Sequence, residues 1–142
     1  MRISPIVQNR LRTTHTSFEV DLVLDNNITF INGDSGVGKS AVYSFIQEMT
    51  TENKNIRCLN YLDKNKNYRN SIKRSKGKLF VIDNADVLLD TKMRRHIAMD
   101  TENQFIIFGR NPEGLMLSQD EIYEIDSKTA DGITRFTLKK SF

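Results

Sequence analysis

The sequence predicts an α/β domain with three layers, in which helices cover both faces of a mostly parallel central sheet and antiparallel strands flank it. Two unbroken apolar runs, residues 79–82 and 105–108, have the composition of strands buried on both faces of a parallel sheet. Apolar residues recur with a helical period after residue 40. Because strands and helices alternate along 142 residues, we expect a single domain over residues 1–142.

The first predicted strands come before residue 33. Residues 17–24 alternate between apolar and polar side chains, which indicates a half-buried strand, antiparallel to its neighbour. The apolar positions are Phe18, Val20, Leu22 and Leu24. Asp25, Asn26 and Asn27 predict a turn, and residues 28–31 form a short β-rich run that leads to Gly33.

The segments after residue 40 alternate between helix and strand. In residues 40–49 the apolar side chains fall on one helical face: Val42, Phe45, Ile46 and Met49. Residues 56–62 predict a further strand, residues 64–78 either a helix or an exposed loop, and residues 85–99 a helix. Residues 122–125 and 133–138 predict a C-terminal β-hairpin, because a turn containing Asp131 and Gly132 joins them.

The most specific motif is GxxxxGK[ST], which matches at Gly33, Gly38, Lys39 and Ser40 between a predicted strand and a predicted helix. This pattern is that of a phosphate-binding loop (P-loop), whose main-chain N–H groups converge on a phosphate at the start of the helix. We expect Lys39 to reach the β- and γ-phosphates and the Ser40 hydroxyl to bind Mg²⁺. The residues expected to bind the nucleotide are Gly33, Asp34, Ser35, Gly36, Val37, Gly38, Lys39, Ser40 and Ala41.

An acidic residue follows the first buried strand. Asp83 ends the run LFVID, where a carboxylate would lie beside the Mg²⁺ ion of a bound nucleotide. The next residue is Asn84, and a neutral amide can orient water but cannot accept its proton. Asp86 has two interpretations, a substitute base or a cap of the following helix. Slow hydrolysis is therefore expected.

A cation follows the second buried strand. Arg110 comes after residues 105–108 and Gly109, at a position within reach of the γ-phosphate of a nucleotide. It could sense the nucleotide state or stabilise transition-state charge. Asn111 is the rival for that role, and a surface loop arginine is the alternative. The residues assigned to catalysis are Lys39, Asp83, Asn84, Asp86 and Arg110, and those assigned to the metal are Ser40 and Asp83.

The segments GDSGVGKS, LFVIDNAD and QFIIFGRNPEGL together resemble the ATPase core of AAA-type and STAND-type P-loop proteins. The alternating strand before the loop is similar to the entry into the loop of ABC and SMC proteins. The order of these segments also resembles small P-loop proteins of Gram-positive bacteria and their mobile elements. The resemblance implies a P-loop NTPase sandwich that binds ATP and Mg²⁺. No LSGGQ-like segment or helical lid is found, and the Glu expected after Asp83 is missing.

The segment 64–78 is strongly basic and contains no acidic residue. With Tyr61 and Tyr68 it offers phosphate neutralisation and aromatic stacking, which nucleic-acid binding would use. The alternatives are a solvated segment that only aids solubility, or a lid over the nucleotide. Of Lys92, Arg94 and Arg95, an arginine could reach a neighbouring subunit, but a surface helix face is the favoured interpretation.

Composition limits the remaining possibilities. The lone Cys58 and the lack of a signal-peptide-like start favour a reducing, cytoplasmic location, and no apolar run is long enough for a membrane helix. We expect ATP, or another nucleoside triphosphate, with Mg²⁺, and a weak ATPase that acts as a switch or within a larger assembly, with a homo-oligomer or protein partner among the options. The alternative is a nucleotide-dependent binding module with negligible turnover, and a phosphotransferase is a third, less favoured option.

Overall fold

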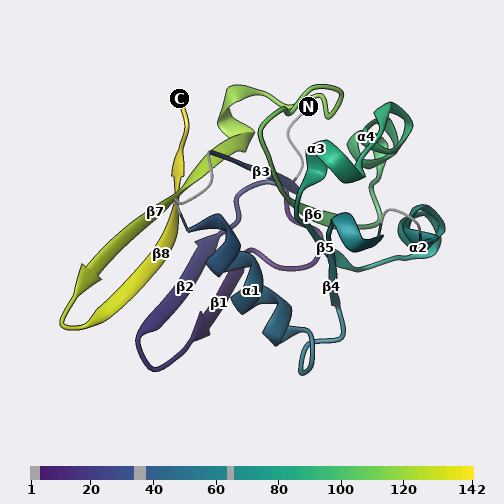
Figure 1. Ribbon diagram of the computed structural model, residues 1–142. Helices are drawn as coiled ribbons and strands as arrows, with labels where there is room; N and C mark the ends of the chain where they lie inside the picture. Colours follow the sequence, from purple (N-terminus) through teal and green to yellow (C-terminus); the bar gives the residue numbers. More distant parts are fainter. Residues whose placement is uncertain (1–3, 34–37, 64–65) are drawn as a thin grey trace.

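The computed structural model describes residues 4–33, 38–63 and 66–142. Its strands are β1 (Arg10–Thr14), β2 (Phe18–Val23), β3 (Ile28–Asn32), β4 (Ile56–Leu59), β5 (Leu79–Ile82), β6 (Gln104–Gly109), β7 (Ile122–Ala130) and β8 (Ile133–Lys140). Its helices are α1 (Lys39–Met49), α2 (Tyr68–Arg74), α3 (Ala85–Leu88) and α4 (Thr91–Met99), with short 3₁₀ turns η1 (Tyr61–Asp63) and η2 (Gln119–Glu121). The α/β class is confirmed (Figure 1).

The described strands form one mixed sheet in the order β1-β2-β8-β7-β3-β6-β5-β4. Strands β4, β5, β6, β3 and β7 are neighbours in parallel pairs, and β2 also runs parallel to β8. The antiparallel pairs are β1 with β2 and β7 with β8. The predicted C-terminal hairpin is confirmed, and its turn residues Asp131 and Gly132 both have the positive φ that a tight hairpin turn requires.

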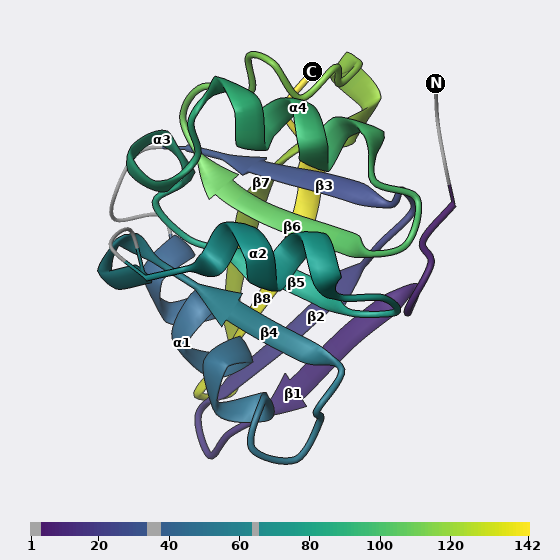
Figure 2. The ribbon, with the colours of Figure 1, turned by 90° about the vertical axis from the view of Figure 1, so that its right-hand side faces the viewer.

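Helices cover the central strands on both faces. On one face α1 packs its buried Val42 and Ile46 against a cluster that includes Val81 of β5 and Ile106 of β6. On the other face α2, α3 and α4 pack against the alternate residues of the same strands, such as Phe105. In Figure 2, α2 and α4 lie in front of these strands. The residues of the unbroken apolar runs therefore pack alternately against the helices on the two faces of the sheet, as predicted.

The sheet curls around α1. This helix contacts β1 and β4, the two edge strands at opposite ends of the strand order. Only one face of β1, β2 and β8 joins the core, through residues such as Leu11, Val20 and Phe136. The charged residues that alternate with them form ion pairs: Arg10 with Asp21 at 2.6 Å, and Glu19 with both Arg12 at 2.7 Å and Arg135 at 3.0 Å.

Three local features differ from the sequence prediction, and one open alternative is decided. Strand β1 was not predicted. Residues 56–62 form β4 only as far as Leu59 and then turn through η1. For the segment 64–78 the helix alternative is confirmed, with α2 over Tyr68–Arg74. Residues 85–99 contain two helices, because Asp90 adopts an extended conformation and accepts a hydrogen bond from the Met93 N–H, which starts α4.

Candidate functional site

The five residues that the sequence assigned to catalysis line one pocket of about 380 Å³. Its lining also includes Ser40 and Gly109, and the described residues that line it are Lys39, Ser40, Asp83, Asn84, Asp86, Val87, Phe108, Gly109 and Arg110. The volume is within the range of small-molecule sites. Segments far apart in the sequence thus converge on one cavity.

The sheet topology explains this convergence. Strands β3, β6 and β5 are parallel neighbours, so their carboxyl ends meet at one edge of the sheet. Helix α1 follows β3 on one face, whereas α3 follows β5 on the other. Where consecutive connections leave a parallel sheet toward opposite faces, a crevice opens at the strand ends. The pocket lies at that crevice.

The phosphate-loop motif is only partly described. Asp34, Ser35, Gly36 and Val37 lie outside the described residues. Gly33 and Gly38 both have positive φ, of 148° and 91°. A Cβ on Gly38 would lie 2.8 Å from the Phe136 ring, so both its backbone conformation and the packing of β8 require glycine.

Helix α1 begins directly after Gly38, with Lys39 and Ser40 in its first turn. The N-cap Gly38 offers no side-chain hydrogen bond, and the first turn contains no acidic residue. Free N–H groups and the positive end of the dipole at such a terminus favour an anion. The Lys39 ammonium donates a hydrogen bond to the Gly33 carbonyl. Ala41 is absent from the pocket lining, and its side chain packs against the core.

Asp83 is half-buried at the end of β5. Its N–H donates to the Leu59 carbonyl of β4, and its carboxylate accepts from the Asn84 N–H at 2.9 Å. Burial raises the pKa of Asp83 above its ordinary value, and the Asn84 hydrogen bond and the charge of Lys39 oppose this shift only in part. A cation at this carboxylate would favour its ionised form.

Asn84 has a left-handed backbone conformation, with φ of 52° and ψ of 46°. Asparagine tolerates this region better than a longer side chain does. The residue is exposed and forms the N-cap of α3 without a side-chain hydrogen bond. The backbone therefore gives a physical reason for an asparagine at this position.

Asp86 does not cap α3, so that interpretation is wrong. Its carboxylate reaches to the end of β6 and accepts from the main-chain N–H groups of Arg110 at 2.8 Å and Asn111 at 3.1 Å. It also accepts from the Arg94 guanidinium at 3.3 Å. Three donors therefore occupy the carboxylate that the sequence offered as a base.

Arg94 and Arg110 differ in environment. Arg94 is 9% exposed, so the favoured assignment of this residue to a surface helix face is wrong. Arg110 is exposed, and its guanidinium forms no hydrogen bond or ion pair with the other described residues. Of the two rivals after β6, Arg110 lines the pocket, whereas Asn111 lines an adjacent cleft.

The basic segment 64–78 is less available for stacking than its sequence suggested. Tyr68 is buried, and its hydroxyl donates to the Leu88 carbonyl. Arg69 pairs with Asp90 at 2.8 Å and lies over the Tyr68 ring. Tyr61 is exposed. The expected pair of stacking tyrosines is therefore reduced to one, and Lys64 lies outside the described residues.

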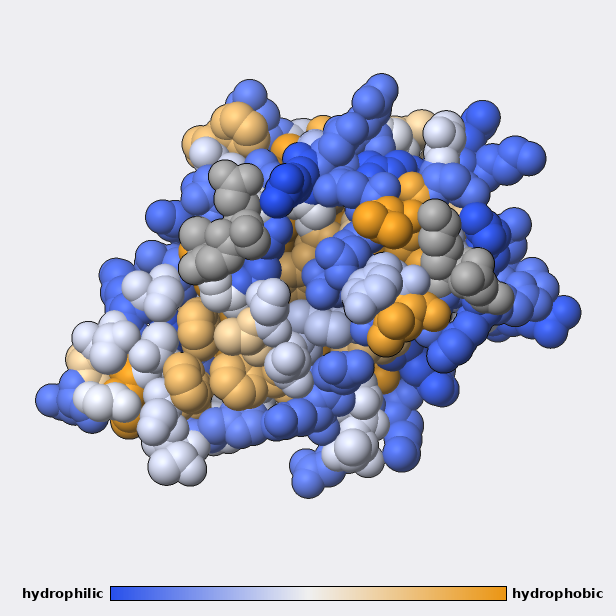
Figure 3. Space-filling view, in the orientation of Figure 1, coloured by the Kyte–Doolittle hydropathy of each residue, from blue (hydrophilic) through white to orange (hydrophobic). Residues whose placement is uncertain are grey.

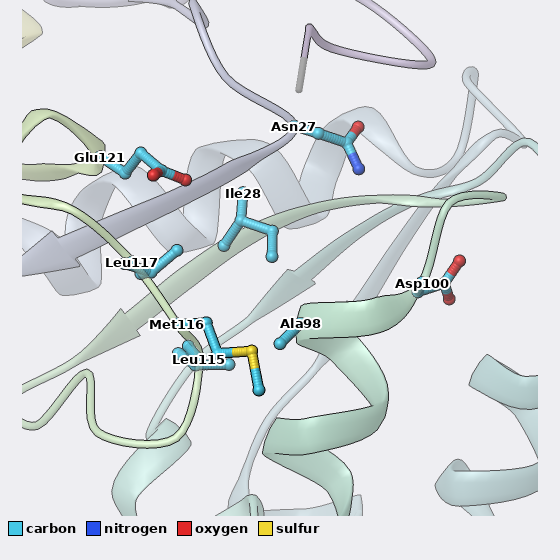
Figure 4. A pocket seen from close by; sticks show the side chains of 8 residues that line it. All are labelled: Asn27, Ile28, Ala98, Asp100, Leu115, Met116, Leu117 and Glu121. Atoms are coloured by element: carbon cyan, nitrogen blue, oxygen red, sulfur yellow. The ribbon is translucent and has the colours of Figure 1, made fainter. Parts of the chain in front are cut away.

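A second cavity, between the start of β3 and the end of α4, is too small for an organic ligand (Figure 4). Its volume of about 30 Å³ corresponds to about one water molecule. The Glu121 carboxylate at its wall already accepts hydrogen bonds from the Ser118 N–H and hydroxyl. The cavity is a packing gap beside a capped turn.

The described side chains that line the pocket of about 380 Å³ could hold a metal ion only together with ligands from a bound molecule. Among the residues that the structure describes, no three His, Cys, Asp or Glu side chains gather to hold a metal by themselves. Mg²⁺ is commonly held by one or two carboxylates together with phosphate oxygens. Ser40 and Asp83, which line the same pocket, fit that kind of site.

Within residues 4–33, 38–63 and 66–142, every helix is too short or too polar to cross a bilayer. No protein-family model matches the sequence, and no curated protein is significantly similar to it.

Proposed function

We propose that this chain is a P-loop NTPase that binds ATP with Mg²⁺ and hydrolyses it slowly, as a switch or as the ATPase part of a larger assembly. The observation that carries the proposal is the convergence of Lys39, Asp83 and Arg110 on one pocket. These residues follow the carboxyl ends of β3, β5 and β6. Nothing in local packing requires a lysine, a half-buried carboxylate and an arginine without a partner among the described residues to face the same space.

The arrangement of the sheet supports a three-layer P-loop sandwich. The proposed loop follows β3, a strand with parallel neighbours on both sides. The strand that ends in Asp83 is separated from it by β6, the strand that ends beside Arg110. A P-loop at a helix start needs this strand–loop–helix order, and a metal-binding carboxylate must approach from a nearby strand end.

Each residue has a distinct role in this proposal. Lys39 would leave the Gly33 carbonyl and neutralise the β- and γ-phosphates, while the first N–H groups of α1 bind phosphate oxygens. Ser40 and Asp83 would hold Mg²⁺, whose chemical contribution is to neutralise charge on the phosphates. Arg110 would bind the γ-phosphate with a guanidinium that is otherwise unpaired among the described residues.

Slow turnover follows from the lack of a free base among the described residues of the pocket lining. Asn84 cannot accept a proton, and Asp86 already accepts three hydrogen bonds. Asp83 is the remaining carboxylate of the described lining, and the metal would occupy it. Positioning and charge stabilisation would therefore supply the catalysis that remains.

The second candidate is a nucleotide-dependent binding module with negligible turnover. Its support is an exposed apolar patch at the pocket rim, formed by Tyr61 and Leu62 of η1 and Val87 of α3. The elements η1 and α3 are in contact, and Val87 itself lines the pocket. Figure 3 shows apolar surface among hydrophilic side chains on the face that carries α1. A partner bound at this patch would contact the nucleotide pocket directly.

The test combines calorimetric titration of ATP, ADP and GTP, with and without Mg²⁺, with phosphate-release assays. Lys39→Ala should weaken ATP binding at least about tenfold and abolish release, because it removes a charge-assisted contact. Asp83→Asn should remove the Mg²⁺ dependence. The exposed Lys92→Ala on α4 is the matched charge control and should change neither.

The outcomes separate the two candidates. Release that is lost in Lys39→Ala supports the slow ATPase. Binding heat without release in the wild type supports the binding module. If no nucleoside triphosphate gives binding heat with the wild-type protein, both candidates are wrong.

A further inference from the structure

We propose that Asp86 and Arg94 form a clamp that positions Arg110 for contact with the γ-phosphate, so that Asp86 acts as a positioning residue and not as a base. This inference rests on the proposed function, because it assigns a ligand to Arg110. The clamp is defined by the ion pair between Asp86 and Arg94 and by their hydrogen bonds to the segment 110–113.

Asp86 holds the main chain directly after β6. Its two carboxylate oxygens accept from consecutive N–H groups, those of Arg110 and Asn111, at 2.8 and 3.1 Å. Gly109 permits this approach, because a Cβ there would lie 3.3 Å from the Asp86 carboxylate and 3.2 Å from the Phe30 ring. The first turn of α3 is thereby fastened to the strand end that carries Arg110.

Arg94 completes the clamp from the side of α4. Its guanidinium donates to the carbonyls of Asn111 at 2.6 Å and Glu113 at 2.8 Å, and to Asp86 at 3.3 Å. The residue is almost fully buried, and such a polar side chain is kept only when its donors are satisfied. The N–H groups and carbonyls of the segment after β6 are thus held from two sides.

The clamp also determines which arginine remains available. An acidic side chain next to Arg110 would ordinarily attract that guanidinium away from the pocket. Here Arg94 supplies the counter-charge, and Asp86 contacts only the main chain of Arg110. The Arg110 guanidinium therefore remains available to bind a ligand, while the main chain of Arg110 is held in place by Asp86. Fixed placement is what a charge-stabilising group requires, because a shift of about 1 Å can cost about a hundredfold in rate.

The experiment is a double-mutant cycle on the preference for ATP over ADP. Calorimetry measures this preference as the dissociation constant of ADP divided by that of ATP. Arg110→Ala should lower this ratio about tenfold, as expected for a lost charge-assisted hydrogen bond. Asp86→Asn, which exchanges an acceptor oxygen for an amide donor, should lower it by a similar factor. The double variant should be no worse than either single variant, since the clamp acts through Arg110.

Asp90→Asn is the matched control. Asp90 also accepts a main-chain N–H, from Met93 at 2.8 Å, and pairs with an arginine, Arg69, at 2.8 Å. It has no contact with Arg110, so this variant should lower the melting temperature and leave the ATP-to-ADP ratio unchanged. If Asp86→Asn does not fold, Arg94→Lys tests the same claim, because a lysine keeps the charge but loses the planar fork of donors.

The results separate the clamp from the proposed function. If the wild type prefers ATP but the effects of Asp86→Asn and Arg110→Ala multiply, the clamp is refuted while the NTPase stands. The same holds if Arg94→Lys folds and retains the full ATP preference. If the wild type binds no nucleotide, the proposed function fails and the clamp loses its role with it.

Discussion

The two halves of the sheet differ in how many of their faces are buried. Strands β3, β5 and β6 are covered by helices on both faces, and nearly all of their residues are buried. Strands β1, β2 and β8 bury one face and carry charged residues on the other. The pocket lies at the carboxyl ends of the first group, so the most completely buried strands carry the candidate site.

The difference shows how the candidate site gains support from both halves. The buried half positions Asp83 and Arg110 at the ends of β5 and β6. The half with the charged face supplies Phe136, which packs against Gly38 at the start of α1. Substitutions in the two halves should therefore differ in their effect on the stability of the protein. The following predictions use this contrast.

The largest effect is expected from Phe105→Ala in the buried half. Phe105 is fully buried and its ring lies 5.8 Å from that of Phe80. Its removal should cost about 3–5 kcal/mol in the free energy of unfolding, through lost transfer energy and a residual cavity. Phe18→Ala, at a side chain that is 39% exposed on β2, should cost much less. Equal shifts of the two urea midpoints would contradict the contrast between the halves.

Gly38→Ala tests the contact between the start of α1 and Phe136 of β8. The positive φ alone should cost about 1–3 kcal/mol of stability, and the contact with Phe136 should add to it. Gly77→Ala is the matched control, because Gly77 has a φ of 68° and no atom within 4 Å of an added Cβ. Thermal unfolding of both variants measures the difference. If Phe136→Leu in the Gly38→Ala background restores no stability, the contact is not the cause.

The smallest effect is expected on the charged face. The hydrogen bond from Arg12, and then that from Arg135, lowers the pKa of Glu19 below its ordinary value of 4.5, although burial opposes the shift. The folded state therefore favours the ionised form, and this stabilisation is present above pH 4.5 and is lost as the pH falls through the lowered pKa.

Glu19→Gln should therefore have a slightly lower urea midpoint than the wild type near neutral pH. The two midpoints should converge as the pH is lowered below 4.5. A difference that stays constant over the whole pH range would show that packing, and not charge, causes the loss. The effect is expected to be small, because ion pairs near the surface contribute little.

The sequence predicted the buried half of the fold well and the charged half less completely. Unbroken apolar runs identified β5 and β6, since only burial on both faces tolerates them. Strand β1 was missed, because its alternation of arginine with Leu11 and two threonines carries little hydrophobic signal until β2 pairs with it. The parallel pairing of β2 with β8 joins distant segments, and local patterns contain no information about it.

The candidate site shows the same division. A spaced motif and two strand ends predicted Lys39, Asp83 and Arg110, and the structure places all three around one pocket. The helix-cap interpretation of Asp86 and the surface interpretation of Arg94 were wrong. Both side chains have their partners on another element, because Asp86 and Arg94 bond to the main chain of the segment that follows β6. A buried polar contact between remote segments has no signature in either segment alone.

The contact between Gly38 and Phe136 has a consequence for protein synthesis. Gly38 leaves the ribosome long before β8, yet the aromatic ring that lies beside it belongs to β8. Chains are made from the N-terminus, so a nascent chain that ends before residue 133 lacks this contact. The candidate site would then be completed only late in translation, after β8 has been made.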